Sequence, residues 1–426
     1  MLVLRIHWEN PKRMRFQAAS RRSFCLLVLG AGLFHCELAA QTKSPARPPK
    51  PEIAAYRPND PLNGIAFDHF YNLDYDHSII EFTQILQRHP DDPFAVNHLL
   101  VAILFRELDR IGALNSGDYT NDLFVTSARL PADPAAKKQI KDLVDRALGL
   151  EEKRLDANPK DIDALYARGV TRAQSSTYTA LVERAWFSAL RNAVGARRDH
   201  ERVLELDPNY VQAKLIVGTH NYVMGSLSWA EKAAVAMVGL SGSKDKGLEY
   251  LRQAADGPGE TAVDAKIVLL LFLRRERQFD EALKIDRTLI PAYPRNLLMA
   301  IEEGNLLRAA GRDPEAAAVY RRIWQAGRDG HYPSLHYELA ALSLGDVLRS
   351  QKDYSGAVAA YEQVASVPKP DNALLQKASL AAGEAYDALQ KRDLAIKKYN
   401  AVVAMNSESP LAETARKCMK DPCRGD

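Results

Sequence analysis

Apolar residues recur at spacings of three and four along almost the whole chain after residue 62, which predicts α-helices rather than strands. Pro or Asp-Pro breaks interrupt this pattern every 34 to 50 residues, so each helix should be short. Strand signals are nearly absent. We therefore expect an all-α protein in which consecutive helices fold back on one another as antiparallel pairs.

A pattern of small residues and tyrosines occurs three times in the C-terminal third. Three glycines each lie twelve residues before an alanine, and a tyrosine follows four residues after each alanine. The offsets between successive copies are 41 and 38 residues. The positions are Gly304, Ala316 and Tyr320, then Gly345, Ala357 and Tyr361, then Gly383, Ala395 and Tyr399. These linked positions predict repeated helix pairs.

This pattern resembles the tetratricopeptide repeat, a 34-residue helix-turn-helix unit with a small residue in each helix. Where two helices cross, Gly or Ala lets the backbones approach closely while larger residues fill the neighbouring grooves. Ala282 lies 34 residues before Ala316, and Gly169 and Gly218 each follow a proline by ten residues, so the resemblance runs from about Phe67 to Pro410. It implies a right-handed superhelical solenoid of antiparallel helix pairs over residues 63–410, with a concave groove for a protein or peptide partner.

Three stretches depart from the repeat length, near residues 115–133, 177–199 and 225–247. The first reads as a surface loop, and the second should lengthen both helices of its pair. In the third, residues 229–240 form an amphipathic pattern between glycine-rich turns. This third stretch is locally similar to a eukaryotic tetratricopeptide family linked to the outer mitochondrial membrane and inclusion-body clearance, which implies a short helix offered to a partner or a membrane. Alternatively, Trp229, Val235, Met237 and Leu240 fill a gap in the core.

The first forty residues resemble a cleavable bacterial signal peptide. A basic stretch that ends at Arg21 and Arg22 precedes an apolar run over residues 24–34, which is too short to span a bilayer. A cut after Ala40 would follow, and residues 41–62 read as a proline-rich, disordered linker. Residues 20–24 resemble a twin-arginine signal, although an ordinary basic segment fits as well. We expect export to the periplasm or the envelope.

Cys418 and Cys423 are the cysteines that lie beyond the signal segment, within a C-terminal tail predicted for residues 411–426. In an oxidising compartment two neighbouring thiols are free to join, so we expect a small disulfide loop. A metal site is the weaker interpretation, because no histidine lies nearby and two thiols do not complete a coordination shell.

Charge and motifs exclude several classes of function. The chain has 57 basic and 54 acidic residues, and without residues 1–40 the balance is 51 to 52. Such a neutral chain has no field to attract a polyphosphate, so nucleic acid is not expected as a partner. No catalytic triad, metal-ligand set or nucleotide loop can be written down. We therefore expect no enzymatic activity, no metal and no cofactor.

The candidate partner-binding residues lie on the first helices of successive units. Arg274, Arg308 and Arg349 each follow the small position by four residues and could form a ladder that holds carboxylates of a partner. Tyr222 and Asn305 join them as candidate groove residues. Alternatively, Arg308 pairs with Asp346, and Arg349 with Glu384, across adjacent units. The function predicted is a protein-binding scaffold, and the alternative is a membrane-peripheral assembly factor that docks through residues 229–240.

Overall fold

The computed structural model describes residues 56–114, 131–229, 232, 236, 240–333 and 335–423. The predicted signal peptide and most of the predicted linker lie outside these residues. Over the described part the chain is helical and contains no strand. The helices are α1 (Asn63–Tyr71), α2 (Tyr75–Arg88), α3 (Pro93–Arg110), α4 (Pro134–Ala157), α5 (Ile162–Leu181), α6 (Trp186–Leu206), α7 (Lys214–Ser226), α9 (Lys244–Ala255), α10 (Glu260–Arg275), α11 (Phe279–Ala292), α12 (Leu297–Ala309), α13 (Asp313–Arg328), α14 (Glu338–Ser350), α15 (Tyr354–Gln363), α16 (Asn372–Ala388), α17 (Arg392–Met405) and α18 (Pro410–Lys420).

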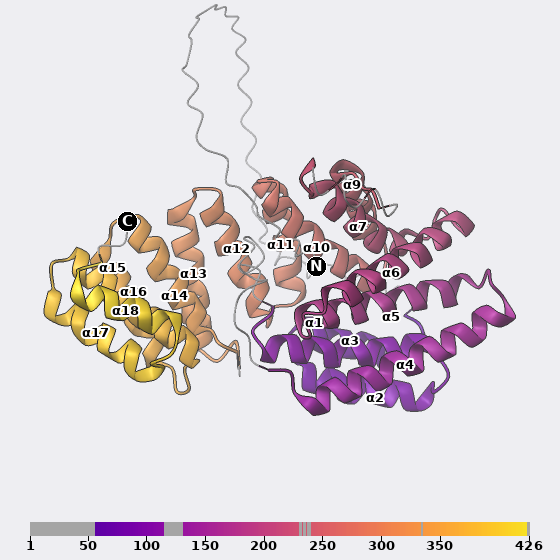
Figure 1. The fold of residues 1–426 in the computed structure, drawn as a ribbon, viewed down its shortest axis with the longest axis horizontal. Coiled ribbons are helices and arrows are strands. Elements are labelled where there is room, and N and C mark those ends of the chain that lie inside the picture. The colour runs from indigo at the N-terminus through magenta and orange to yellow at the C-terminus, as the bar shows by residue number, and fades with distance from the viewer. Residues whose placement is uncertain are drawn as a thin grey trace, which may run out of the picture. The chain divides into compact units, whose positions relative to one another are not determined.

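Successive helices pack against one another as helix pairs, from α1 with α2 to α16 with α17 (Figure 1). Alternate helices are also in contact: α3 with α5, α7 with α10, and α14 with α16. This two-layer packing is the tetratricopeptide arrangement, so the predicted all-α solenoid of helix pairs is confirmed. Each helix pair is called a unit below.

The Asp-Pro and Ser-Pro breaks in the sequence are helix starts. The side chain of Asp92 accepts a hydrogen bond from the backbone of Phe94, and Pro93 occupies the first turn. Asp133 caps α4 and Ser409 caps α18 in the same way, each directly before a proline. A short polar side chain satisfies backbone N–H groups that the first turn leaves unpaired, and proline at this point sacrifices no hydrogen bond.

The glycine of the repeat pattern is required because an aromatic ring lies on it. A Cβ atom added at Gly304 would lie 2.4 Å from the ring of Tyr320, and one at Gly383 would lie 2.5 Å from Tyr399. Both rings are fully buried. The spacing of glycine, alanine and tyrosine therefore results from one packing contact between the two helices of a unit.

The same packing position is occupied by other side chains in the earlier units. In the unit of α5 and α6, the ring of His200 lies over Gly169, 2.3 Å from the position a Cβ would take. In the first unit the buried Phe82 follows Ser78 by four residues, as Tyr320 follows Ala316. A tyrosine is thus one of several solutions to the same contact.

The segment before α1 is folded against the helices, so the disordered linker predicted for residues 41–62 is wrong over residues 56–62. Tyr56 stacks on Phe67 with ring centroids 5.2 Å apart. The carboxylate of Asp60 is buried and accepts hydrogen bonds from Arg88 at 2.7 and 2.8 Å. Proline content indicated an extended chain, but it could not show that aromatic and charged side chains anchor it.

First helices that are far apart in sequence contact one another. The hydroxyl of Tyr71 in α1 donates to a carboxylate oxygen of Asp264 in α10, at 2.9 Å. The side-chain amide of Asn296 donates to the backbone oxygen of Tyr71, and the hydroxyl groups of Tyr166 and Thr261 lie 3.1 Å apart. The inner face of these units is therefore covered in part by the chain itself.

The predicted C-terminal tail is a helix rather than an extension beyond the fold. Helix α18 packs against α17 and α16, and Cys418 is fully buried in that contact. The sulfur atoms of Cys418 and Cys423 are bonded to each other in the structure. The apolar face of α18 supplies the driving force, so α18 covers the exposed end of the last unit as a capping helix does in a repeat protein.

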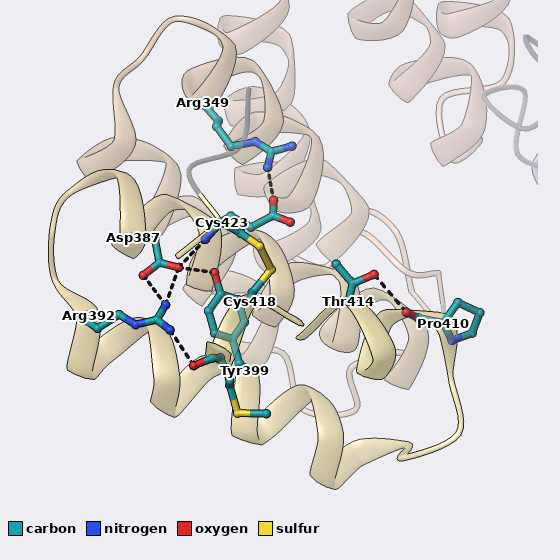
Figure 2. Close-up of a disulfide and its surroundings, with 10 residues drawn as sticks. Arg349, Asp387, Arg392, Tyr399, Pro410, Thr414, Cys418 and Cys423 are labelled. Carbon is teal, nitrogen blue, oxygen red and sulfur yellow. Dashed lines mark hydrogen bonds and ion pairs between the residues drawn. A yellow bond between two sulfur atoms is a disulfide. The ribbon is translucent and has the colours of Figure 1, made fainter. Parts of the chain in front are cut away.

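Asp387 of α16 ties this end of the stack together (Figure 2). Its carboxylate accepts hydrogen bonds from the hydroxyl of Tyr399 at 2.8 Å and from Arg392 at 2.9 Å. It also accepts from the backbone N–H of Cys423 at 3.0 Å, and Arg392 donates to the backbone oxygen of Met419. The disulfide loop therefore delivers a backbone donor to a buried carboxylate.

Reduction of this disulfide is expected to destabilise the C-terminal helices by about 2 kcal/mol, the chain-entropy value for so short a loop. Urea unfolding followed by circular dichroism, with and without a thiol reductant, measures this change. A Cys423→Ala variant is the control, since the reductant should leave its unfolding curve unchanged. Superimposable curves for the oxidised and reduced wild type would contradict the expectation.

Candidate functional site

The arginine ladder predicted from the sequence is a series of ion pairs between successive units. Arg274 pairs with Glu302 at 3.0 Å, and Arg308 lies 3.8 Å from Asp346. Arg349 pairs with Glu384 (Figure 2). The two cross-unit pairs considered as the structural alternative, those of Arg308 and Arg349, are therefore present. Each links the first helix of one unit to the first helix of the next.

The ladder arginines differ in how accessible they are. The side chain of Arg274 is 14% exposed, whereas that of Arg308 is 43% exposed and has the longest pairing distance. The exposed pairs are each expected to contribute only about 0–1 kcal/mol of stability. Arg308 is thus the ladder position that an external carboxylate could reach most easily.

Tyr222 and Asn305 are engaged within the stack. Tyr222 is 1% exposed, and its hydroxyl donates to Glu276 at 2.8 Å. The prediction that Tyr222 lines an open groove is therefore wrong, because α10 covers its ring and Phe272 stacks on it at 3.8 Å. Asn305 accepts a hydrogen bond from the hydroxyl of Tyr320 at 2.8 Å. The sequence shows that Tyr222 and Asn305 are polar, but it does not show that each is hydrogen-bonded to another residue of the stack.

A second surface, which the sequence analysis did not identify as a site, lies along α6. An open groove of about 700 Å³ is lined by apolar side chains from α4, α6 and the segment before α9, and by arginines from α5 and α6. The apolar lining residues include Leu148, Phe187, Leu190, Val194 and Leu240, and the arginines are Arg172, Arg191 and Arg198. We call this surface the α6 groove.

Two of the arginines in the α6 groove have no partner among the described residues. Arg172 pairs with Asp199 at 2.6 Å. Arg191 and Arg198 are exposed and form no ion pair or hydrogen bond with a described side chain. An apolar surface bordered by unpaired guanidinium groups is suited to an apolar ligand that carries carboxylates.

Large apolar side chains are exposed in the same part of the chain. Phe187 is 90% exposed, Trp186 is 43% and Leu190 is 44%. Trp229, which follows α7, is 85% exposed. Single exposed apolar residues are common on proteins, but a group of large ones indicates an interaction surface.

Residues of two irregular stretches lie in this region, and the helix that follows the third contacts it. The additional residues of 177–199 lie in the long helices α5 and α6, whose turn is followed by Trp186. Helix α4, which follows residues 115–133, places Lys137 2.8 Å from Glu183 in that turn. Leu240, within the third stretch, lines the α6 groove. Insertions in repeat proteins often form the binding face, and here residues of two of them, 177–199 and 225–247, line the α6 groove.

The predicted amphipathic helix at residues 229–240 lies mostly outside the described residues. Of the four side chains expected to fill a gap in the core, Val235 and Met237 lie outside the described residues, Trp229 is exposed and Leu240 is 5% exposed. The core-filling alternative therefore holds for Leu240 and fails for Trp229.

His220 of α7 has a structural environment. The ring of His220 lies 2.8 Å from the guanidinium of Arg197. Burial, together with that positive charge, lowers the pKa of His220 to about 4. His220 is therefore neutral at physiological pH, as a structural histidine should be.

The described residues contain no group of three metal-ligating side chains. Within that same part of the chain, none of the helices combines the length and apolar character needed to cross a bilayer.

Comparison with protein-family models and with curated proteins yields no match. Among solved structures, the chain is similar to the APC/C hetero-tetramer Cut9–Hcn1, with a TM-score of 0.42 and 14% identity over 84% of this chain and 55% of that one. It thus spans about half the length of that protein. A tetratricopeptide repeat protein from Parabacteroides merdae matches with a TM-score of 0.31 and 12% identity, over 74% of this chain and 97% of that one. Human IFIT1 with m7Gppp-AAAA matches with a TM-score of 0.38 and 12% identity, over 84% and 79%.

Proposed function

We propose that this protein is a non-enzymatic scaffold of the bacterial envelope that binds an amphipathic helix of a partner protein in the α6 groove. The observation that carries the proposal is the groove itself, which combines an apolar surface with two exposed arginines that pair with none of the described side chains. Helical repeat stacks have long surfaces suited to binding by many modest contacts. Export, which the basic and apolar pattern of residues 1–40 supports, is part of the proposal.

The chemistry of the groove defines the partner. Leu148 and Leu190 come from separate helices and would contact the apolar face of a helix laid across them, above the mostly buried Leu240. Arg191 and Arg198 would form charge-assisted hydrogen bonds with acidic residues at the edge of that face. The expected ligand is therefore an amphipathic helix whose polar edge carries Asp or Glu.

The arginine ladder is given a structural role in this proposal. A partner carboxylate at Arg274 or Arg349 would have to displace Glu302 or Glu384, which already neutralise these arginines. In the α6 groove a partner carboxylate can pair with Arg191 or Arg198 without displacing another carboxylate, so binding there costs less free energy. The placement of the partner on Arg274, Arg308 and Arg349, as the sequence predicted, is retained as the second arm of the experiment.

A membrane is the second candidate partner. Phe187 and Trp229 are almost fully exposed, and aromatic side chains flanked by basic residues are typical of proteins that lie on a bilayer surface. In this alternative the protein docks peripherally on anionic lipid. Flotation with anionic vesicles tests this alternative. A protein that stays at the bottom of the gradient while the vesicles float, in both low and moderate salt, does not dock on membranes.

Replacing Leu190 by Asp and Arg191 by Glu together should abolish partner capture, because the variant inserts a charge into the apolar surface and reverses one at its edge. The chain from Gln41 onward would be used to capture proteins from envelope extract of its own source. The expected loss is at least about 100-fold in retained partner, or about 3 kcal/mol. A variant with Arg274, Arg308 and Arg349 all changed to Ala should retain the partner.

The matched control is the double variant Leu394→Asp and Arg321→Glu, which makes the same changes at exposed positions on α17 and α13. Leu394 is 38% exposed, close to the value for Leu190. The control should capture the same proteins as the wild type. Loss of the partner only in the triple arginine variant would place the site on the ladder and contradict the α6 groove.

A further inference from the structure

A second, smaller pocket lies between the segment before α1, the N-terminus of α10 and the connection after α6. It has a volume of about 270 Å³. The residues that matter for its chemistry are Arg57, Phe94, Tyr166, Asp207, Tyr210 and Glu260. None of them belongs to the α6 groove, and the inference drawn from them is independent of the proposed function.

Aromatic rings form one side of the pocket. Phe94 and Tyr166 stack with centroids 6.1 Å apart, and Tyr166 and Tyr210 lie 5.0 Å apart. The hydroxyl of Tyr166 is held 3.1 Å from that of Thr261. A group of fixed aromatic rings offers negative π faces to a cation.

Carboxylates outnumber cations around the pocket. Asp207 and Glu260 line it, and Asp264 lies one helical turn beyond Glu260 on α10. Burial raises the pKa of Glu260, and it raises that of Asp264 to about 7, with Glu260 adding to the latter shift. Arg57 is the one cationic side chain among the described residues that line this pocket. The site is therefore short of positive charge.

Arg57 shows which kind of group the pocket accepts. Its guanidinium carbon lies 5.7 Å from the centroid of the Phe94 ring, within cation–π range. The same guanidinium pairs with Asp163 at the start of α5, and its side chain is 47% exposed. Arg57 thus covers only the edge of the pocket, and it comes from the segment before the first helix rather than from the helical stack.

We propose that this pocket is a recognition site for an organic cation, a guanidinium or an alkylammonium group. The cation would lie against Phe94, Tyr166 and Tyr210 and pair with Glu260 and Asp207. Arg57 competes with it from within the chain. The same chemistry is found on an arginine side chain of a peptide and on a free polyamine.

Isothermal titration calorimetry at low salt tests the proposal with two probes, N-acetylarginine methylamide and spermidine. Arg57→Ala should bind at least one probe about tenfold more tightly than the wild type, because the internal competitor is gone. Adding Glu260→Gln should weaken that binding about tenfold or more. Adding Glu152→Gln, which removes an exposed carboxylate from α4, should change nothing.

The two probes distinguish the sources of the cation. Preference for the arginine derivative indicates a peptide, and preference for spermidine indicates a polyamine. If circular dichroism shows that Glu260→Gln unfolds the protein, Asp207→Asn replaces it with the same expected loss. Binding that is absent from Arg57→Ala, or unaltered by removal of the carboxylate, would overturn the proposal.

Discussion

Gly345→Ala is expected to destabilise the protein by about 2 kcal/mol, although alanine is the better helix former. A Cβ atom at this position would lie 2.4 Å from the ring of Tyr361. That ring cannot move aside freely, because it is buried and its hydroxyl donates to Asp346 at 2.8 Å. Overpacking a core of this kind costs about 1–3 kcal/mol. Urea unfolding followed by circular dichroism measures the change.

Gly149→Ala is the matched control, since it makes the same substitution in the middle of α4. Apart from the backbone of its own helix, no atom of the described residues lies within 4 Å of the position its Cβ would take. Helix propensity then acts alone, and the variant should be more stable by up to about 1 kcal/mol. Opposite signs for the two variants are expected. Equal stabilisation by both would show that the ring contact does not determine the glycine.

Asp286→Asn is expected to stabilise the protein at neutral and alkaline pH by at least about 2 kcal/mol. Asp286 occupies the tyrosine position of its unit, four residues after Ala282, and is 1% exposed. Neither carboxylate oxygen has a hydrogen-bond partner in the described structure. Burial, with the charges of Glu302 and Glu303, raises the pKa of Asp286 to about 8.

The raised pKa determines how the effect changes with pH. In the unfolded chain Asp286 loses its proton near pH 4, whereas in the folded protein it keeps the proton up to about pH 8. The wild type therefore loses stability as the pH rises between these values, because Asp286 must take up a proton from the solvent when the chain folds. Asparagine does not ionise. The advantage of Asp286→Asn should be small near pH 4, grow with pH and level off above about pH 8.

Unfolding measured at a series of pH values checks this profile. Asp91→Asn is the control, because Asp91 is exposed and forms no described ion pair. It should leave both the stability and its pH dependence unchanged. A stability difference between wild type and Asp286→Asn that stays constant from pH 4 to pH 9 would contradict the ionisation of this group.

The helix-pair architecture could be predicted from the sequence because one packing contact recurs. The glycine under the tyrosine ring leaves a fixed spacing in the chain, as Gly304 and Tyr320 show, and that spacing is independent of surface chemistry. Where another side chain fills the tyrosine position, such as His200 or Asp286, only the four-residue step from the preceding alanine is kept. The two ends of the helical stack were less predictable. Segment 56–62 and α18 are held by contacts with distant residues, such as Asp60 with Arg88.

The candidate site was predictable only in part. Cross-unit pairs such as Arg308 with Asp346 follow from repeat register, because equivalent positions of adjacent units lie side by side. The α6 groove does not follow from register, since it forms where departures from the repeat meet. The signal was present in Trp186 and Phe187, two large apolar residues at the start of a lengthened helix. Only the structure shows that their side chains point away from the core.

Site-specific photocrosslinking tests the central claim that the α6 groove binds a partner protein most directly. Phe187 would be replaced by p-benzoylphenylalanine in the full chain, expressed in its own source and irradiated in intact cells. Leu394, exposed on α17, would carry the same group as the control. We expect one specific protein adduct from position 187, lost on adding Leu190→Asp and Arg191→Glu, and none from position 394. Identical adducts from both positions, or none from position 187, would contradict the account.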